Sequence, residues 1–155
     1  MRENCILYIK KSSKGAIIIL FIFLLGVQAH TYPEKGRVCF GDTCFSVELA
    51  TNSSQQAHGL KFRKHLEHSQ GMLFIYKVED KRSFWMSDMC IPLDIIWMNK
   101  NREVVFIKKD AQPCTDNKCL IITPNKKAMY VLELNSGISE DINLKVGDAL
   151  HFYLE

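Results

Sequence analysis

Short apolar runs of strand length, each closed by a turn signal, recur along most of this chain and constrain its fold more than any other feature. Val, Ile and aromatic residues are typical of strands, whereas Gly, Asn and Asp between the runs are typical of turns. Nine such runs are candidates for about eight short strands. They lie within residues 37–40, 45–49, 71–76, 84–86, 93–98, 103–109, 120–123, 128–134 and 149–154. Their short connections favour antiparallel pairing.

Two segments are expected to be helical. Residues 51–63 predict one helix with Ser53 or Ser54 as its N-cap, and Gly59 lowers the helix propensity inside it. Residues 138–144 predict one or two further helical turns. Because strands dominate, the sequence predicts a single α+β domain that is mainly antiparallel β. Its sheet is expected to be curled or barrel-like, with one or two short helices.

The N-terminal segment has the three parts of a secretory signal peptide. Basic residues precede the apolar run 16–27, and small side chains up to Ala29 fit a cleavage site. This run is shorter than the roughly 20 residues that span a bilayer, so we expect export to the periplasm or the extracellular space. The alternative is an uncleaved segment that anchors the protein to the inner membrane. The predicted organisation is a signal peptide over 1–29, a loose mature N-terminus over 30–37 and one β-rich domain over 38–155.

Removal of the signal peptide changes the charge balance. The whole chain holds 20 Lys and Arg residues and 17 Asp and Glu residues. Residues 1–29 hold four of the basic residues and one of the acidic residues. The remainder is therefore balanced, with sixteen residues of each sign. A nucleic-acid partner requires a clustered basic excess, so we expect no such partner.

The cysteines after residue 29 fall into two pairs and one remainder. Cys39 and Cys44 flank one turn, and Cys114 and Cys119 flank another. In an exported protein these spacings favour two local disulfides, although cross-pairing and a four-cysteine zinc site stay open. Cys90 is left over, and it is either a buried, inert side chain or a reactive thiol.

Residues 83–94 crowd sulfur, an indole and carboxylates into one short stretch. Met86, Met89 and Cys90 are soft ligands of the kind that Cu(I) prefers, and Trp85 lies beside them. A copper-binding site is therefore one hypothesis for this segment. The alternative is that these residues fill an irregular part of the core, and the leading interpretation assigns no cofactor.

Carboxylates next to apolar runs suggest a second kind of site. One hypothesis is a small polar pocket lined by Arg63, Asp88, Asp94 and Glu133. Trp85 and the neighbouring Met86 would form its wall. The alternative is a set of structural ion pairs and turn caps. If two of the carboxylates face each other, the pocket could also act as a hydrolase-like general acid and base.

Several segments in order resemble the bacterial and archaeal family called domain of unknown function 192. The resemblance covers residues 38–152 and rests on the motifs Gly59-Leu60-x-Phe62-Arg63, Gly71-Met72-Leu73-Phe74, Phe84-Trp85-Met86, Pro92-Leu93-Asp94-Ile95, Val131-Leu132-Glu133-Leu134 and Gly147-Asp148. It implies a small β-rich domain, often exported, with no established activity. Two places depart from the family pattern: Lys61 stands where the family usually has Met, and Ser87-Asp88-Met89 replaces Lys-Asn-Thr.

The sequence lacks the common catalytic motifs: the Gly-x-Ser-x-Gly elbow, the P-loop, the glycine pattern of dinucleotide sites and His-Glu-x-x-His. Whether the protein is an enzyme therefore stays open. The leading functional hypothesis is an exported β-rich domain that binds a small ligand or an envelope protein. Copper binding and carboxylate-based hydrolysis are the alternatives. A membrane contact is expected only through an uncleaved signal segment.

Overall fold

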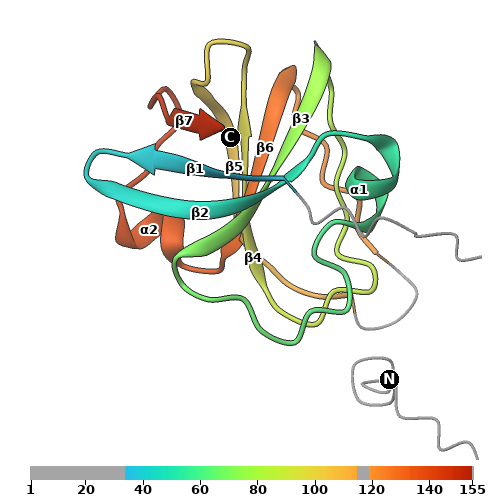
Figure 1. The fold of residues 1–155 in the computed structure, drawn as a ribbon. Helices are drawn as coiled ribbons and strands as arrows, with labels where there is room; N and C mark the ends of the chain where they lie inside the picture. The colour runs from blue at the N-terminus through green and yellow to red at the C-terminus, as the bar shows by residue number, and fades with distance from the viewer. Residues whose placement is uncertain (1–33, 115–118, 155) are drawn as a thin grey trace, which may run out of the picture.

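The structure is a computed structural model that describes residues 34–114 and 119–154. The predicted signal peptide and cleavage site lie outside the described residues. One seven-stranded sheet has the order β5-β4-β6-β3-β2-β1-β7 (Figure 1). The strands are β1 (Lys35–Phe40), β2 (Thr43–Ala50), β3 (Gln70–Asp80), β4 (Leu93–Met98), β5 (Val104–Ala111), β6 (Ala128–Asn135) and β7 (His151–Leu154). The helices are α1 (Ser53–His58) and α2 (Ile138–Asp141).

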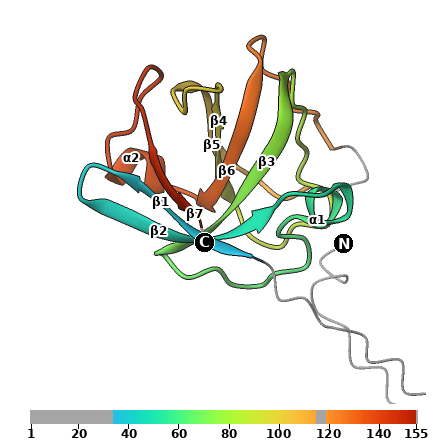
Figure 2. The ribbon, with the colours of Figure 1, turned by 45° about the horizontal axis from the view of Figure 1, so that its top comes forward.

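The sheet is curled but not closed. All neighbouring strands are antiparallel except β2 and β3, which are parallel and connected through α1. The turn before β7 approaches the start of β5, where the Val104 amide donates to the Asp148 carbonyl at 2.7 Å. Within the described residues β5 and β7 form no ladder, so the sheet stays an open, bent surface (Figure 2). The predicted fold class is confirmed.

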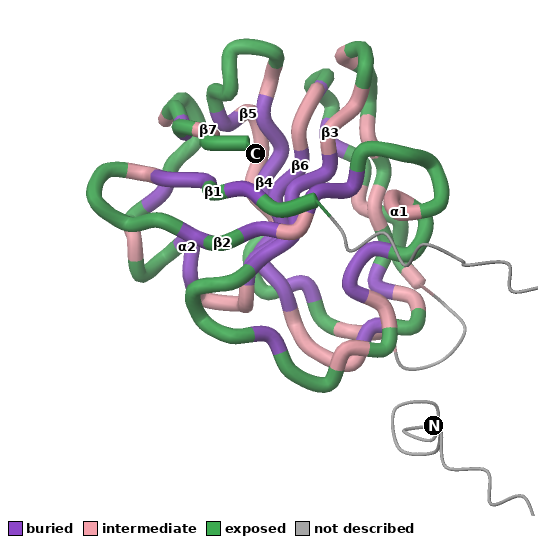
Figure 3. Tube along the Cα trace, in the orientation of Figure 1, coloured by how far each residue is buried: buried purple, intermediate pink, exposed green. Residues whose placement is uncertain are grey.

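Side chains alternate between the two faces of the central strands and build two separate cores. On β4, Ile96 and Met98 belong to a first core, which the short helix α2 covers. The alternate residues of β4, Ile95 and Trp97, point to the other face of the sheet and belong to a second core. The second core is covered by Leu60, Leu66, Met86 and Met89, which lie outside the named strands and helices. All six residues of β4 are buried, and buried backbone follows the centre of the sheet in Figure 3.

Both predicted local disulfides are present. Cys39 and Cys44 face each other across the β1–β2 hairpin, and Cys114 is bonded to Cys119. These bonds exclude the zinc alternative in this state, because disulfide sulfurs are not thiolate ligands. Cys90, which the sequence left over, is disulfide-bonded as well.

The helix predicted over residues 51–63 is shorter than expected. Asn52, rather than a serine, forms a capping box with Gln55, and α1 ends where Gly59 takes a φ of 54°. Glycine reaches this left-handed conformation without a steric penalty, so it stops the helix and turns the chain back toward the sheet.

The strand boundaries also differ in places. β3 continues four residues beyond its predicted end at residue 76, whereas segments 84–86 and 120–123 contribute only the isolated bridge between Phe84 and Ile122. β1 begins at Lys35, so residues 35–37 belong to the sheet rather than to the predicted loose N-terminus.

Gly71 allows β3 to approach β6 closely. A Cβ at this position would lie 2.5 Å from the carbonyl oxygen of Glu133 and 2.7 Å from a Leu134 methyl carbon. We expect Gly71→Ala to lower the free energy of unfolding by about 1–3 kcal/mol through overpacking, measured by urea unfolding. Gly41→Asn is the control, because Gly41 has open space around it and asparagine tolerates its positive φ. Equal stability of Gly71→Ala and the wild type would show that this contact can relax.

Candidate functional site

A cavity of about 140 Å³ opens over the second core. Residues 56–61 form one side of it, and β3 contributes Phe74 and Tyr76. The rest of the lining comes from Ser83, Phe84, Trp85 and Met89, and from Glu133 of β6. We call this cavity the aromatic pocket. Its walls combine apolar and aromatic side chains with several polar groups, as small-molecule sites commonly do.

Glu133 is the acidic side chain that lines the aromatic pocket. It follows the alternation of β6, so it points to the face of Val131 and not to that of Leu132 and Leu134. The side chain is buried, with 5% of its surface exposed, and Oε2 has no hydrogen-bond partner in the described part of the chain. Burial raises the pKa of Glu133 from 4.5 to about 8. At neutral pH the group is therefore mainly a protonated carboxylic acid.

Tyr76 forms the wall next to Glu133. Burial raises the pKa of Tyr76, the Arg82 guanidinium opposes this rise, and the nearby Glu133 adds to it. The Arg82 guanidinium lies 3.9 Å from the centre of the Tyr76 ring. The backbone of Arg82 is fixed in turn, because the Trp97 indole donates to its carbonyl at 2.8 Å. The phenol is thus held in place, protonated, at the edge of the pocket.

At the rim of the pocket, the segment around Phe62 and the segment around Asp88 are hydrogen-bonded to each other, and both residues have strained backbone conformations. Phe62 and Asp88 both have positive φ angles, of 62° and 61°, and the Phe62 amide donates to the Asp88 carbonyl at 2.9 Å. The Lys61 ammonium lies 3.6 Å from the Asp88 carboxylate. Trp85, at the same rim, is 51% exposed. Non-glycine residues in this conformation are uncommon and concentrate at functional sites.

Asp94 does not share the aromatic pocket with Glu133. It is fully buried and accepts hydrogen bonds from the Ser139 amide at 2.8 Å, the Ser139 hydroxyl at 2.6 Å and the Asp110 amide at 2.9 Å. In the alternation of β4 it lies in phase with Ile96, on the opposite face of the sheet from Glu133. The paired carboxylates predicted for a hydrolase are therefore not brought together, because neighbouring strands place these two residues on different faces.

Arg63 is also placed differently from the prediction. Its two terminal nitrogens each lie 2.6 Å from a Glu48 oxygen, so it forms a bidentate pair with β2 instead of with Asp94 or Glu133. Of the residues predicted to form one pocket, Trp85 and Glu133 line it, and Asp88 reaches its rim through Lys61. The sequence missed the walls at Phe74 and Tyr76, which their spacing of two in a strand could have indicated.

The predicted copper ligands are packed differently from an open metal site. Met86 and Met89 are buried members of the second core, and Cys90 is disulfide-bonded. Across residues 34–114 and 119–154, no three His, Cys, Asp or Glu side chains are grouped to hold a metal. Copper binding stays a prediction, and it would require the Cys90 disulfide to be reduced.

The sequence pattern of the family DUF192, described as "Uncharacterized ACR", matches residues 37–152. The chain belongs to this family. Two archaeal relatives are UPF0127 proteins of Thermococcus gammatolerans and Thermococcus kodakarensis, which are 30% and 28% identical over 118 residues. The match covers 75% of this chain in both cases, and 69% and 68% of the relatives.

Two solved structures share the fold. A proposed transcription regulator from Sinorhizobium meliloti 1021 has a TM-score of 0.69 and 28% identity, over 78% of this chain and 94% of that one. A protein of unknown function from Novosphingobium aromaticivorans has a TM-score of 0.67 and 33% identity, over 76% of this chain and 83% of that one. Both structures share the fold of this chain, and neither description assigns chemistry to the aromatic pocket.

Asp94 is expected to be structural. An amide at this position cannot accept from three donors, because its NH₂ group would face one of them. We expect Asp94→Asn to lower the free energy of unfolding by about 2–4 kcal/mol in urea unfolding. Asp141→Asn, an exposed carboxylate on the helix that Asp94 contacts, serves as the control and should have little effect. An unchanged midpoint for Asp94→Asn would refute the structural role.

Glu133 should make the stability of the protein depend on pH. Its pKa is higher in the folded protein than in the unfolded chain, so unfolding releases a proton between these two values. The free energy of unfolding should therefore fall as pH rises from about 4.5 to about 8, by up to ~5 kcal/mol, and then level off. Glu133→Gln should remove this slope and be more stable than the wild type at pH 9.

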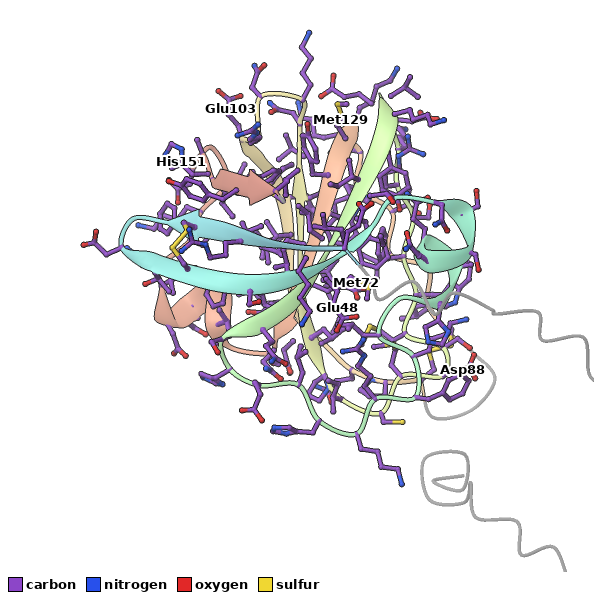
Figure 4. All side chains as sticks on the ribbon, in the orientation of Figure 1. Glu48, Met72, Asp88, Glu103, Met129 and His151 are labelled. Atoms are coloured by element: carbon purple, nitrogen blue, oxygen red, sulfur yellow. A yellow bond between two sulfur atoms is a disulfide. The ribbon has the colours of Figure 1, made fainter. Side chains whose placement is uncertain are left out.

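The control for this measurement is Glu103→Gln, which makes the same change of charge. Figure 4 shows Glu103 at the opposite side of the molecule from Asp88 and the rim of the pocket. Its pH profile in urea unfolding should follow that of the wild type. Parallel profiles for Glu133→Gln and the wild type would mean that Glu133 ionises normally in the fold.

Proposed function

We propose that this DUF192 domain binds a small ligand in the aromatic pocket, with the Glu133 carboxyl as the polar group at its base. The observation that carries the proposal is the buried Oε2 atom of Glu133, which has no hydrogen-bond partner among the described residues. An unsatisfied buried polar group costs about 1–3 kcal/mol, so its retention requires an explanation. A ligand that supplies the missing partner would offset this penalty.

The size of the pocket limits the ligand. A cavity of about 150 Å³ in another protein holds one benzene molecule, and the aromatic pocket has about 140 Å³. The buried part of the ligand is therefore compact, with roughly six non-hydrogen atoms. The half-exposed Trp85 at the rim offers a surface for a portion that extends outside.

The proposed place of action is outside the cytoplasm. The Cys39–Cys44 and Cys114–Cys119 disulfides are compatible with export, because such bonds persist in oxidising compartments. In the described ranges no helix is long and apolar enough to cross a bilayer. The signal-like N-terminal sequence supports the same location.

A binding role fits the pocket better than hydrolysis. Acid–base hydrolysis by two carboxylates needs both groups at one reacting bond, and Asp94 lies behind the sheet from Glu133. The apolar walls at Phe74 and Phe84 instead give the ligand a large contact area, and one acid gives it an orientation.

The test uses 3,3-dimethyl-1-butanol, a compact neutral alcohol that matches the pocket in size. We expect amide NMR shifts at pocket residues and a dissociation constant on the order of 1 mM. Ala57→Phe, which places a ring at the pocket side of α1, should weaken binding about tenfold or more. Val146→Phe, at an exposed position that does not line the pocket, is the control and should leave binding unchanged. Binding that Ala57→Phe does not weaken would place the alcohol elsewhere and overturn the proposal.

A further inference from the structure

We infer that the aromatic pocket recognises an organic cation, with an alkylammonium head held between aromatic rings and the Glu133 carboxylate. The inference rests on the proposed ligand-binding function and specifies the chemical class of the ligand. It is carried by two features of the geometry: four aromatic side chains line one small cavity, and one buried carboxyl with an unpartnered oxygen lines it too.

The walls are suited to a cation. Phe74, Tyr76, Phe84 and Trp85 all line the cavity, and the Phe74 and Phe84 rings meet edge to face with centroids 5.0 Å apart. Aromatic rings attract cations through their quadrupoles, and cages of such rings are the usual way that proteins bind quaternary ammonium groups. The Tyr76 ring already carries the Arg82 guanidinium at 3.9 Å.

Arg82 leaves the pocket itself open to a second cation. It lines a neighbouring groove together with Lys77 and Asn52, and it is not part of the aromatic pocket. Lys61, which does line the pocket, has its ammonium 3.6 Å from the Asp88 carboxylate at the rim. The Lys61 ammonium is thus paired at the rim, and Arg82 donates from Nη2 to the Val78 carbonyl. Glu133 Oε2, like Arg82 Nε, has no hydrogen-bond partner within the described chain.

Binding of a cation to Glu133 should release a proton. The protonated carboxyl loses H⁺ to solvent, and the resulting carboxylate pairs with the ammonium, so charge and atoms balance. With a pKa of about 8 in the free protein, the ionised fraction rises roughly tenfold between pH 7 and pH 9. The affinity for a permanent cation should rise by about the same factor over this range.

Other titratable groups face the same cavity and must be separated from Glu133. His58 lies at the end of α1, Lys61 follows it, and Tyr76 projects from β3 with Arg82 on its other side. Burial raises the pKa of Tyr76 above its usual 10.0, so the phenol keeps its proton up to pH 9. The pH series is therefore repeated in His58→Gln and Lys61→Gln, which should both keep the rise in affinity.

The experiment compares three probes of matched shape by NMR titration at pH 7 and pH 9. Choline carries a quaternary ammonium, 3,3-dimethyl-1-butanol is its neutral carbon analogue, and 3,3-dimethylbutyrate is an anion of similar size. We expect choline to bind about tenfold more tightly at pH 9 than at pH 7, and to exceed the alcohol at pH 9 by tenfold or more. Glu133→Gln should remove the pH dependence and the preference for the cation, whereas Glu103→Gln should keep both.

The outcomes separate this inference from the proposed function. If the alcohol binds in the pocket as well as choline does, the cation class is wrong and the ligand-binding function stands. Preferential binding of the butyrate would instead assign an anionic ligand and would also overturn the inference. If no probe shifts the pocket residues, or if Ala57→Phe leaves binding unchanged, both the proposed function and the inference fail.

Discussion

The alternation of side chains along the central strands decides what chemistry this fold can present. β4 is buried over its whole length, and β6 lies between β3 and β4, so side chains on these strands face one of two closed cores. A polar residue there must find partners inside the protein or face a cavity. The positions of Asp94 and Glu133 follow from this constraint. Glu133 pairs with Ile95 rather than with Asp94, and neighbouring residues of a strand point to opposite faces of the sheet.

These two carboxylates show the two ways in which a buried acid is accommodated. Asp94 receives three hydrogen bonds from Ser139 and Asp110, and it ties α2 and the end of β5 to the first core. Glu133 has an unpartnered oxygen and remains protonated because of desolvation. A buried acid with all its hydrogen bonds helps to specify one folded structure, whereas a buried acid without partners lowers the stability of the fold. Local violations of this kind are expected at functional sites, which is why Glu133 and not Asp94 defines the candidate site.

Local features were predictable from the sequence, whereas contacts across the sheet were not. The β1–β2 hairpin with its Cys39–Cys44 bridge depends on neighbouring residues, and the predicted bounds of β4 agree with the structure. The partner of Arg63 is Glu48, fifteen residues away on a strand that pairs parallel with β3, and no local pattern indicates that pairing. The opposite faces of Asp94 and Glu133 likewise depend on the register between β4 and β6. The sequence therefore placed Trp85 and Glu133 in one pocket, as the structure does, but it added Arg63 and Asp94, which lie elsewhere.

The two departures from the family pattern meet at one place in the structure. Lys61 stands where the resemblance to the family predicts Met, and Asp88 stands where it predicts Asn. Their side chains are 3.6 Å apart at the rim of the aromatic pocket, so each new charge has the other as its partner. A single charge there would add a field of one sign beside Glu133, whereas the pair adds little net charge. By this resemblance the rim differs in polarity from the family pattern, whereas Glu133 stands within the matching motif Val131-Leu132-Glu133-Leu134. Under the proposed function, Glu133 would contact the buried part of the ligand, and the Lys61–Asp88 pair would lie beside the part that extends past the rim.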